Sequence, residues 1–299
     1  MKYIIDTDPG IDDAIAIMMA LRHHLDIIGF TLATGNIPLE KAENNLKIIE
    51  DFMESNIPIF KGAHLNTCNP ETAEHAHGKD GLGYAVFPKN ITRQTEKMTA
   101  EDFIIKASKK YPNNLTIICL GPFTNLANAI KKDPTLVHRV SKVVTMSATY
   151  NPNSNEFYKE FNIRIDPISA QIVYGSAFKE IQAITHEIGV QAFIEKDYIQ
   201  NLKHSDDNIS RLISLIAEKY IEFSYEHYNT IGLGTPDPIT IASILDENLI
   251  TFEPFNIEIS TNAETYAECY ATPNEKSNIY LSTSFDLEKY RNIFKNTFK

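Results

Sequence analysis

The predicted fold is of the α/β class, with an open, mostly parallel, Rossmann-like sheet and helices on both of its faces. Apolar runs of strand length alternate with segments whose apolar residues recur at helical spacing. The opening segments follow a strand-helix-strand-helix-strand order, which is typical of parallel sheets. Polar residues follow the first two strand-like runs, at the sheet edge where such folds bind ligands.

The first third of the chain carries the clearest alternation. Its predicted elements are a strand at 3–5, a helix from 11 to about 25, a strand at 27–32, a helix at 39–53 and a strand at 57–60. Pro9-Gly10 forms the first turn, and Thr34-Gly35-Asn36 ends the second strand. Residues 63–98 are polar and irregular, and such a long connection predicts a lid or a site loop.

The later segments continue the pattern without a linker or an internal repeat, so we expect a single domain over residues 1–299. Polar residues 147–160 form a second loop between two of these elements. The predicted elements are helices at 100–111, 123–132, 167–174, 206–230, 235–245 and 285–297 and strands at 115–120, 140–146, 181–185, 255–260, 266–271 and 278–282.

Composition excludes several classes of partner. A net charge of −11, with no Lys/Arg-rich stretch, repels nucleic acid and anionic membranes. Cys68, Cys119 and Cys269 have no CxxC spacing, which predicts reduced thiols rather than a disulfide framework or a zinc site. No apolar run reaches transmembrane length. These features predict a cytoplasmic enzyme with no nucleic-acid or membrane partner.

Four carboxylates lie together after the first strand. Asp6, Asp8, Asp12 and Asp13 fall within eight positions, at the end of a strand and the start of a helix. Aspartate is common at helix starts, where it caps free N–H groups, but this explains one or two of the four. The rest repel one another unless a cation lies among them, and Mg²⁺ and Ca²⁺ are the cations that oxygen ligands favour.

Five later segments accompany the opening motif Asp6-Thr7-Asp8-Pro9-Gly10-Ile11-Asp12-Asp13. They are Thr34-Gly35-Asn36, His77-Gly78 before Asp80-Gly81-Leu82-Gly83, Gly121-Pro122-Phe123-Thr124-Asn125-Leu126-Ala127, Glu160-Phe161-Asn162 before Asp166-Pro167, and Asp237-Pro238. In content and order this set resembles the calcium-dependent inosine-uridine nucleoside hydrolase family. The resemblance implies a nucleoside-hydrolase-like fold and hydrolysis of ribonucleosides to ribose and free base by a Ca²⁺-bound water. It also implies a homodimer or a homotetramer.

The resemblance assigns a role to each matching residue. It makes Asp8, Asp13, Asp237 and the Leu120 carbonyl the Ca²⁺ ligands, an oxygen-only set that suits this ion. It makes Asp8 the base that removes a proton from the attacking water, which Asn36 orients. Substrate contacts fall on Asp12, His77, Met146, Glu160, Asn162 and Asp237, with the ribose hydroxyls at Asp12 and Asp237 and the 5′ side at Glu160 and Asn162.

Each of these residues also has a simpler interpretation. Asn36 after Gly35 can be a turn residue, and Asp237 between two prolines can be a helix N-cap. His77 alone is more often a loop histidine, and Glu160 and Asn162 can be solvated. Only the combination of all the segments favours a site.

The sequence departs from the family where the base leaves. Many members carry a histidine directly before the last aspartate, where it protonates the leaving base, but here that residue is Pro236. A purine-specific branch stacks the base between tryptophans, and this chain has none. We therefore expect low activity on inosine or an atypical base preference. Tyr225, His227 and Tyr228 are candidates for contacting the base, and Tyr228 is the preferred one.

A second departure concerns the loop before Glu160. The family asparagine there falls on Ser154, and Asn153 or Asn155 replaces it after a one-residue shift.

Two other functions stay open. One is a ribonucleoside- or ribose-binding protein on the same fold, with turnover lost. The other is a haloacid-dehalogenase-type phosphatase, whose first motif is also a strand followed by D-x-D. In that family Pro9-Gly10 would be out of place and Asp12-Asp13 would have no role.

Overall fold

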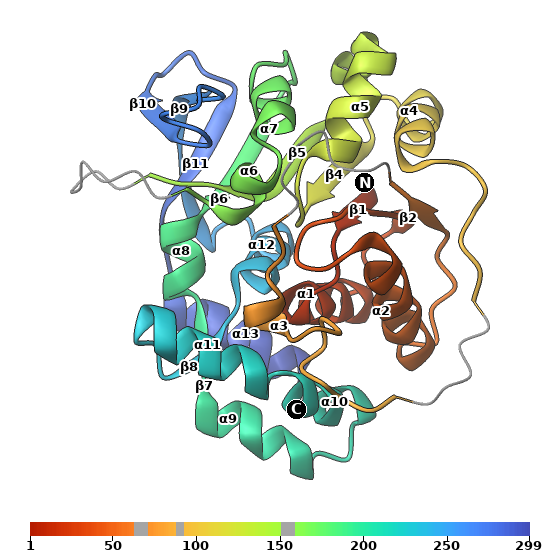
Figure 1. The fold of residues 1–299 in the computed structure, drawn as a ribbon, viewed down its shortest axis with the longest axis vertical. Helices are drawn as coiled ribbons and strands as arrows, with labels where there is room; N and C mark the ends of the chain where they lie inside the picture. Colours follow the sequence, from red (N-terminus) through yellow and green to blue (C-terminus); the bar gives the residue numbers. More distant parts are fainter. Residues whose placement is uncertain (63–70, 88–92, 151–158) are drawn as a thin grey trace.

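A nine-stranded sheet runs through the molecule in the order β10-β9-β11-β6-β5-β4-β1-β2-β3. The computed structural model describes residues 1–62, 71–87, 93–150 and 159–299 (Figure 1). The strands are β1 Lys2–Thr7, β2 Ile27–Leu32, β3 Ile59–Lys61, β4 Leu115–Cys119, β5 Lys142–Ala148, β6 Ile181–Thr185, β9 Ile250–Ile259, β10 Cys269–Pro273 and β11 Ile279–Phe285. From β3 to β11 all pairs are parallel, and β9 is antiparallel to both of its neighbours. The prediction of a mostly parallel α/β sheet is confirmed.

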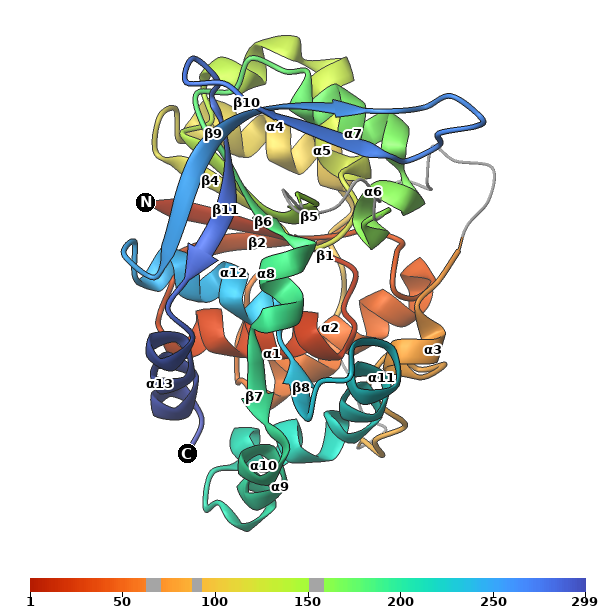
Figure 2. The same ribbon diagram turned by 90° about the vertical axis from the view of Figure 1, so that its left-hand side faces the viewer.

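Helices cover both faces of the sheet because successive strand residues point to opposite sides. On β1, Ile5 belongs to one apolar core and Ile4 to the other, and both are fully buried. Figure 2 shows the two layers on either side of the sheet. One holds α1 Ile11–Arg22, α2 Leu39–Phe52, α12 Pro236–Leu245 and α13 Leu287–Thr297, and the other holds α4 Ala100–Lys110, α5 Thr124–Lys132 and α7 Pro167–Tyr174.

A further group of elements lies mostly below α1 in Figure 1, with α8 beside α12. It contains α3 Glu74–His77, α8 His186–Gln191, α9 Lys196–Asn201, α10 Asn208–Ile216, α11 Glu218–Tyr228 and the antiparallel pair β7 Phe193–Glu195 and β8 Gly232–Gly234. The sequence pattern did not predict α3, α8, α9, β7 or β8, because each is too short to show a period.

The prediction of one continuous helix over 206–230 is wrong, because the helix is interrupted at Ala217 between α10 and α11. Backbone hydrogen bonds from Ala217 to Ile213 and from Ile221 to Ala217 bridge the break. Both parts bury apolar side chains in the same core. The apolar pattern therefore stays helical across the break, and alanine is itself a strong helix former.

Three further predictions have mixed outcomes. The three C-terminal strands exist, with β9 starting earlier and β10 starting later than predicted. Parts of the loops predicted at 63–98 and 147–160 lie outside the described residues, including Ser154 and its neighbours Asn153 and Asn155. Among the helices that the structure describes, none combines the length and apolar character needed to cross a bilayer.

Candidate active site

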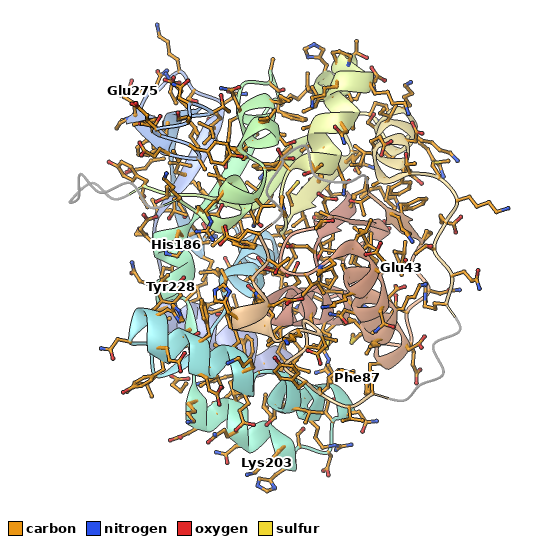
Figure 3. The ribbon with its side chains drawn as sticks, in the orientation of Figure 1. Glu43, Phe87, His186, Lys203, Tyr228 and Glu275 are labelled. Carbon is orange, nitrogen blue, oxygen red and sulfur yellow. The ribbon has the colours of Figure 1, made fainter. Side chains whose placement is uncertain are left out.

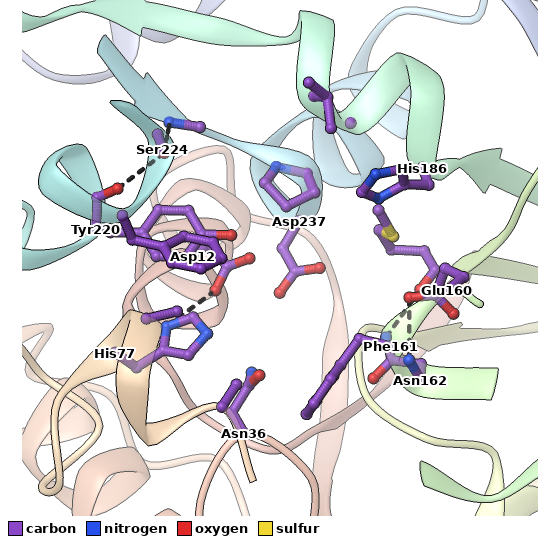
Figure 4. A pocket seen from close by; sticks show the side chains of 18 of the residues that line it. Asp12, Asn36, His77, Glu160, Phe161, Asn162, His186, Tyr220, Ser224 and Asp237 are labelled. Atoms are coloured by element: carbon purple, nitrogen blue, oxygen red, sulfur yellow. Dashed lines mark hydrogen bonds and ion pairs between the residues drawn. The ribbon is translucent and has the colours of Figure 1, made fainter. Parts of the chain in front are cut away.

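Two helix starts bring three buried carboxylates together at the carboxyl edge of the sheet. Asp12 and Asp13 lie in the first turn of α1, and Asp237 lies in the first turn of α12. One carboxylate oxygen from each of the three lies within 4.8 Å of the others. Figure 4 shows Asp12 and Asp237 facing the same space. These oxygens can hold a metal ion.

The electrostatics of this cluster fit a cation. Burial and the neighbouring carboxylates raise the pKa of Asp12 to about 8 and also raise the pKa values of Asp8 and Asp237. Burial raises the pKa of Asp13 as well, although the hydrogen bonds that its carboxylate accepts oppose this shift. The Oδ1 atoms of Asp8 and Asp12 are buried and accept no hydrogen bond from the described residues. A hard divalent cation would both offset the repulsion and satisfy these oxygens.

Glycines and backbone amides hold Asp8 and Asp13 in place. A Cβ atom on Gly35 would lie 2.0 Å from Asp8 Oδ2, and one on Gly121 would lie 2.4 Å from Asp8 Oδ1. The Asn36 amide donates to Asp8 Oδ2 at 2.5 Å, and the Asn36 side chain donates to Asp13 Oδ2 at 2.9 Å. The glycines of the two motifs are thus needed because the Asp8 carboxylate lies directly against their backbone.

The short helix α6 (Phe161–Ile165) positions two polar side chains on one wall. The Glu160 carboxylate caps this helix, accepting from the backbone N–H groups of Asn162 and Ile163 at 3.0 Å each. Asn162 Nδ2 donates to the carbonyls of Leu120 at 2.7 Å and Met146 at 2.9 Å. Burial raises the pKa of Glu160 to about 7. The strand ends of β4 and β5 are therefore tied to the helix that presents Glu160.

His77 forms the opposite wall, at the end of α3. Its Nδ1 atom accepts from the Ile11 backbone N–H at 3.1 Å, and its ring stacks on Tyr220 with centroids 4.9 Å apart. Burial lowers the pKa of His77 to about 3, so the ring is neutral and Nε2 carries its proton. His77 Nδ1 lies 3.7 Å from Asp12 Oδ1, a contact that Figure 4 marks.

Comparison with known proteins identifies the family. The profile described as "Inosine-uridine preferring nucleoside hydrolase" matches residues 3–292. This chain belongs to that family. It is therefore an enzyme of the nucleoside hydrolase type, and nucleosides are the substrates of the family.

Relatives of different stated specificity support this placement of the nucleoside hydrolase. The chain is 33% identical to "Probable uridine nucleosidase 2" of Arabidopsis thaliana, covering 88% of this chain and 83% of that protein. It is 28% identical to the inosine-uridine preferring nucleoside hydrolase of Crithidia fasciculata, and the match covers 97% of this chain and 94% of that protein. The structure of a purine-preferring ribonucleoside hydrolase from Gardnerella vaginalis superposes with a TM-score of 0.91 at 26% sequence identity. The superposition covers 100% of this chain and 98% of that one.

The nucleoside hydrolase pocket brings the predicted site residues together, although their roles remain predictions. The side chains or carbonyls that line it include Asp12, Asn36, His77, Leu120, Met146, Glu160, Asn162, Tyr228 and Asp237, with Asp8 and Asp13 buried below. The carboxylates that come within 4.8 Å of one another are those of Asp12, Asp13 and Asp237, whereas the predicted ligand set had Asp8 in place of Asp12. Of the other candidates for contacting the base, neither Tyr225 nor His227 lines this pocket.

Sequence reasoning missed several aromatic residues of the pocket, among them His186, Tyr220 and Phe223. Tyr220 and Phe223 lie in the amphipathic stretch, where aromatic residues indicate packing. His186 directly follows β6. Because ligands bind at the carboxyl ends of parallel strands, its position after residues 181–185 was a usable signal.

Proposed function

We propose that this nucleoside hydrolase cleaves the N-glycosidic bond of ribonucleosides to ribose and free base, with Ca²⁺ as its metal. The observation that carries the proposal is the buried trio of Asp12, Asp13 and Asp237 at the floor of a ring-lined pocket. Relatives are named for uridine, for inosine and uridine, and for purines, so they support the reaction and leave the base open.

Asp8, Asp13, Asp237 and the Leu120 carbonyl would hold the ion, and all four are buried. An all-oxygen donor set favours Ca²⁺ over softer transition metals. A bound Ca²⁺ would supply positive charge that lowers the pKa of a coordinated water and orients the ribose hydroxyls. Asp12 places a carboxylate oxygen within 4.8 Å of Asp13 and Asp237, two of these proposed ligands, so it is the carboxylate that sugar and metal would share.

The protein's own groups would supply the remaining steps. The Asp8 carboxylate would accept the proton of the attacking water, held in position by the Asn36 amide. Asp12 and Asp237 would accept hydrogen bonds from the 2′- and 3′-hydroxyls. Glu160 would bind the 5′ side of the ribose, together with Asn162. These carboxylates favour the positive charge that develops on the sugar ring as the bond breaks.

The residue before Asp237 would not act as a general acid toward the leaving base. Pro236 lines the pocket, and its ring has no proton to donate. Loss of a general acid typically costs on the order of 10²–10⁴-fold in rate. We therefore expect turnover of inosine to be slow, or the preference to fall on ribosides whose base leaves easily.

Pro236 also favours a second candidate, a ribonucleoside-binding protein with the sugar half of the site intact. Both candidates predict ribose binding, but only a hydrolase releases a reducing sugar.

A reducing-sugar assay over a nucleoside panel, with and without EDTA, separates these possibilities. We expect release of ribose that EDTA abolishes and added Ca²⁺ restores. Release that is indifferent to chelation would refute the metal. Ribose binding by calorimetry without any release would establish the binding protein instead.

A further inference from the structure

His186 is the first residue of α8, and it faces the pocket from the wall opposite α3 (Figure 4). Figure 3 shows it close to Tyr228 of α11, and the two ring centroids lie 5.6 Å apart at 61°. Helix α8 packs tightly against two residues that line the pocket. A Cβ atom on Gly189 would lie 2.8 Å from the Met146 side chain and 3.0 Å from Cβ of Pro236.

The position of α8 is also held at its start. The Glu187 carboxylate accepts from the Thr149 hydroxyl at 2.7 Å and from the Tyr150 backbone N–H at 3.0 Å. These bonds tie α8 to the end of β5. The backbone that carries His186 is therefore fixed relative to the sugar half of the site.

Rings form a continuous arc from the carboxylates to His186. His77 stacks on Tyr220 at 4.9 Å, Tyr220 packs against Phe223 at 5.6 Å, and Phe223 meets Tyr228 edge-on at 5.7 Å. His186 continues this arc beyond Tyr228. A planar heterocycle is complementary to such a wall, whereas a polyhydroxylated sugar is complementary to carboxylates. The arc therefore marks the base half of the pocket.

We propose that His186 is the residue that recognises the base, by hydrogen bonding through its imidazole to the polar edge of an oxo-substituted heterocycle. This inference rests on the proposed nucleoside hydrolysis. Pro236 offers only carbon atoms of its ring to the same wall, whereas the His186 imidazole is a polar group that can meet a carbonyl or N–H of the base. Uracil and hypoxanthine, the bases of the nucleosides for which two of the relatives are named, carry such an edge.

The protonation state of the ring agrees with this role. Burial lowers the pKa of His186 to about 4, although Glu187 opposes the shift. The imidazole is thus neutral near pH 7 and presents one N–H donor and one nitrogen acceptor. A ring nitrogen that faces the pocket can therefore pair with one group of an oxo base, either a C=O or an N–H. A hydrogen-bonding group that the base shields from water also discriminates against bases that cannot satisfy it.

Three variants test the inference. His186→Phe keeps a planar ring but removes both polar atoms, and His186→Gln keeps a donor and an acceptor. His227→Phe is the matched control, because His227 is exposed, packs on Phe223 and does not line the pocket. The substrates are uridine, inosine and an aryl riboside with an activated leaving group that presents no oxo-base edge.

His186→Phe is expected to lower kcat/KM for uridine or inosine by about 10–100-fold and to change that for the aryl riboside by less than about threefold. His186→Gln should recover part of the loss, and His227→Phe should match the wild type. An equal loss on the aryl riboside would overturn the inference, since it would assign His186 to the sugar or to folding.

A binding measurement distinguishes failure of this inference from failure of the proposed function. Calorimetry with a C-nucleoside of an oxo base needs no turnover, because a carbon–carbon bond joins its base to the ribose and is not hydrolysed in this way. If His186→Phe weakens the C-nucleoside about tenfold but leaves ribose binding unchanged, base recognition is supported even where the wild type hydrolyses nothing. Equal C-nucleoside affinity in the variant and the wild type would overturn the role of His186 while leaving hydrolysis intact.

Discussion

Pro236 and Asp237 are neighbours that give the pocket opposite properties. Asp237 brings a buried carboxylate to the metal cluster, and Pro236 brings an apolar ring to the wall above it. Pro236 is the first residue of α12, a position where proline is well tolerated because the N–H it lacks is unpaired in any case. Pro236 thus suits the start of the helix, but it cannot protonate a leaving base.

Restoring a proton donor at this position should raise activity. Pro236→His is expected to increase kcat for inosine by about tenfold or more, because an imidazole there could protonate the base as it leaves. Steady-state assays across pH 5 to 9 would reveal the new ionisation. Pro236→Ala removes the ring without adding an acid and should show no gain. An equal gain in both variants would show that proline merely crowded the pocket.

A single carboxylate of the cluster should control metal binding. In the wild type, Ca²⁺ at 100 times its Kd should add about 2.7 kcal/mol to the free energy of unfolding. Asp13→Asn should remove most of this gain, because it deletes one charge from the buried trio. Thermal melts with and without Ca²⁺ measure the effect. Asp246→Asn, a change at a half-buried carboxylate that pairs with Lys289, should keep the full gain, and a full gain in Asp13→Asn would refute the site.

Helix α6 shows how an element can depend on a residue of the site. Its N-cap is Glu160, whose two oxygens accept backbone N–H groups while the side chain also lines the pocket. One carboxylate therefore stabilises a helix and presents a polar group to substrate.

Substitutions can separate these two uses. Glu160→Ala should lower the free energy of unfolding by about 1–2 kcal/mol, since it removes the cap. Glu160→Gln should lose less than half of that, because the amide oxygen still accepts a backbone hydrogen bond. Urea denaturation gives both values. Similar losses in the two variants would mean that the charge, and not the cap, holds α6.

At the scale of the whole molecule, buried carboxylates link stability to pH. Burial raises the pKa of Asp12 to about 8 and the pKa values of Asp6 and Glu160 to about 7, above the values of about 4 expected in the unfolded chain. The folded state therefore binds protons that the unfolded state releases. The stability these groups contribute is complete below about pH 4 and is lost as the pH rises through 7 to 8.

This linkage predicts that Ca²⁺ stabilises the protein more at high pH. Without the ion, Tm should fall between pH 5.5 and 8.5, as the clustered carboxylates ionise against their burial. Ca²⁺ should recover part of this loss, because it binds the ionised form. Scanning fluorimetry at the two pH values, with EDTA or with Ca²⁺, measures both effects. An equal Ca²⁺ shift at both values would contradict a cation among these groups.

Local sequence patterns predicted most strands of the sheet and many residues of the site. The strands β1, β2, β4 and β6 follow from apolar runs bounded by turns, because their side chains are buried on both faces. The opening aspartates, with Asn36 and Glu160, were found from motifs that stand at strand and helix ends. The break at Ala217 and the short elements α3 and α8 were not predictable, since tertiary packing and not local propensity stabilises segments of this length.

The sequence by itself determined the fold class, the family and the chemical character of the metal-binding floor, because these depend on periodicity and on residues close together in the chain. The family resemblance already predicted Asp237 beside Asp13, but only the tertiary structure decided that Asp12 forms a trio with these two carboxylates, and that His186 completes an arc of rings beside Pro236. Such contacts join segments that are far apart in sequence. They depend on strand order and helix docking, which local patterns of burial do not encode.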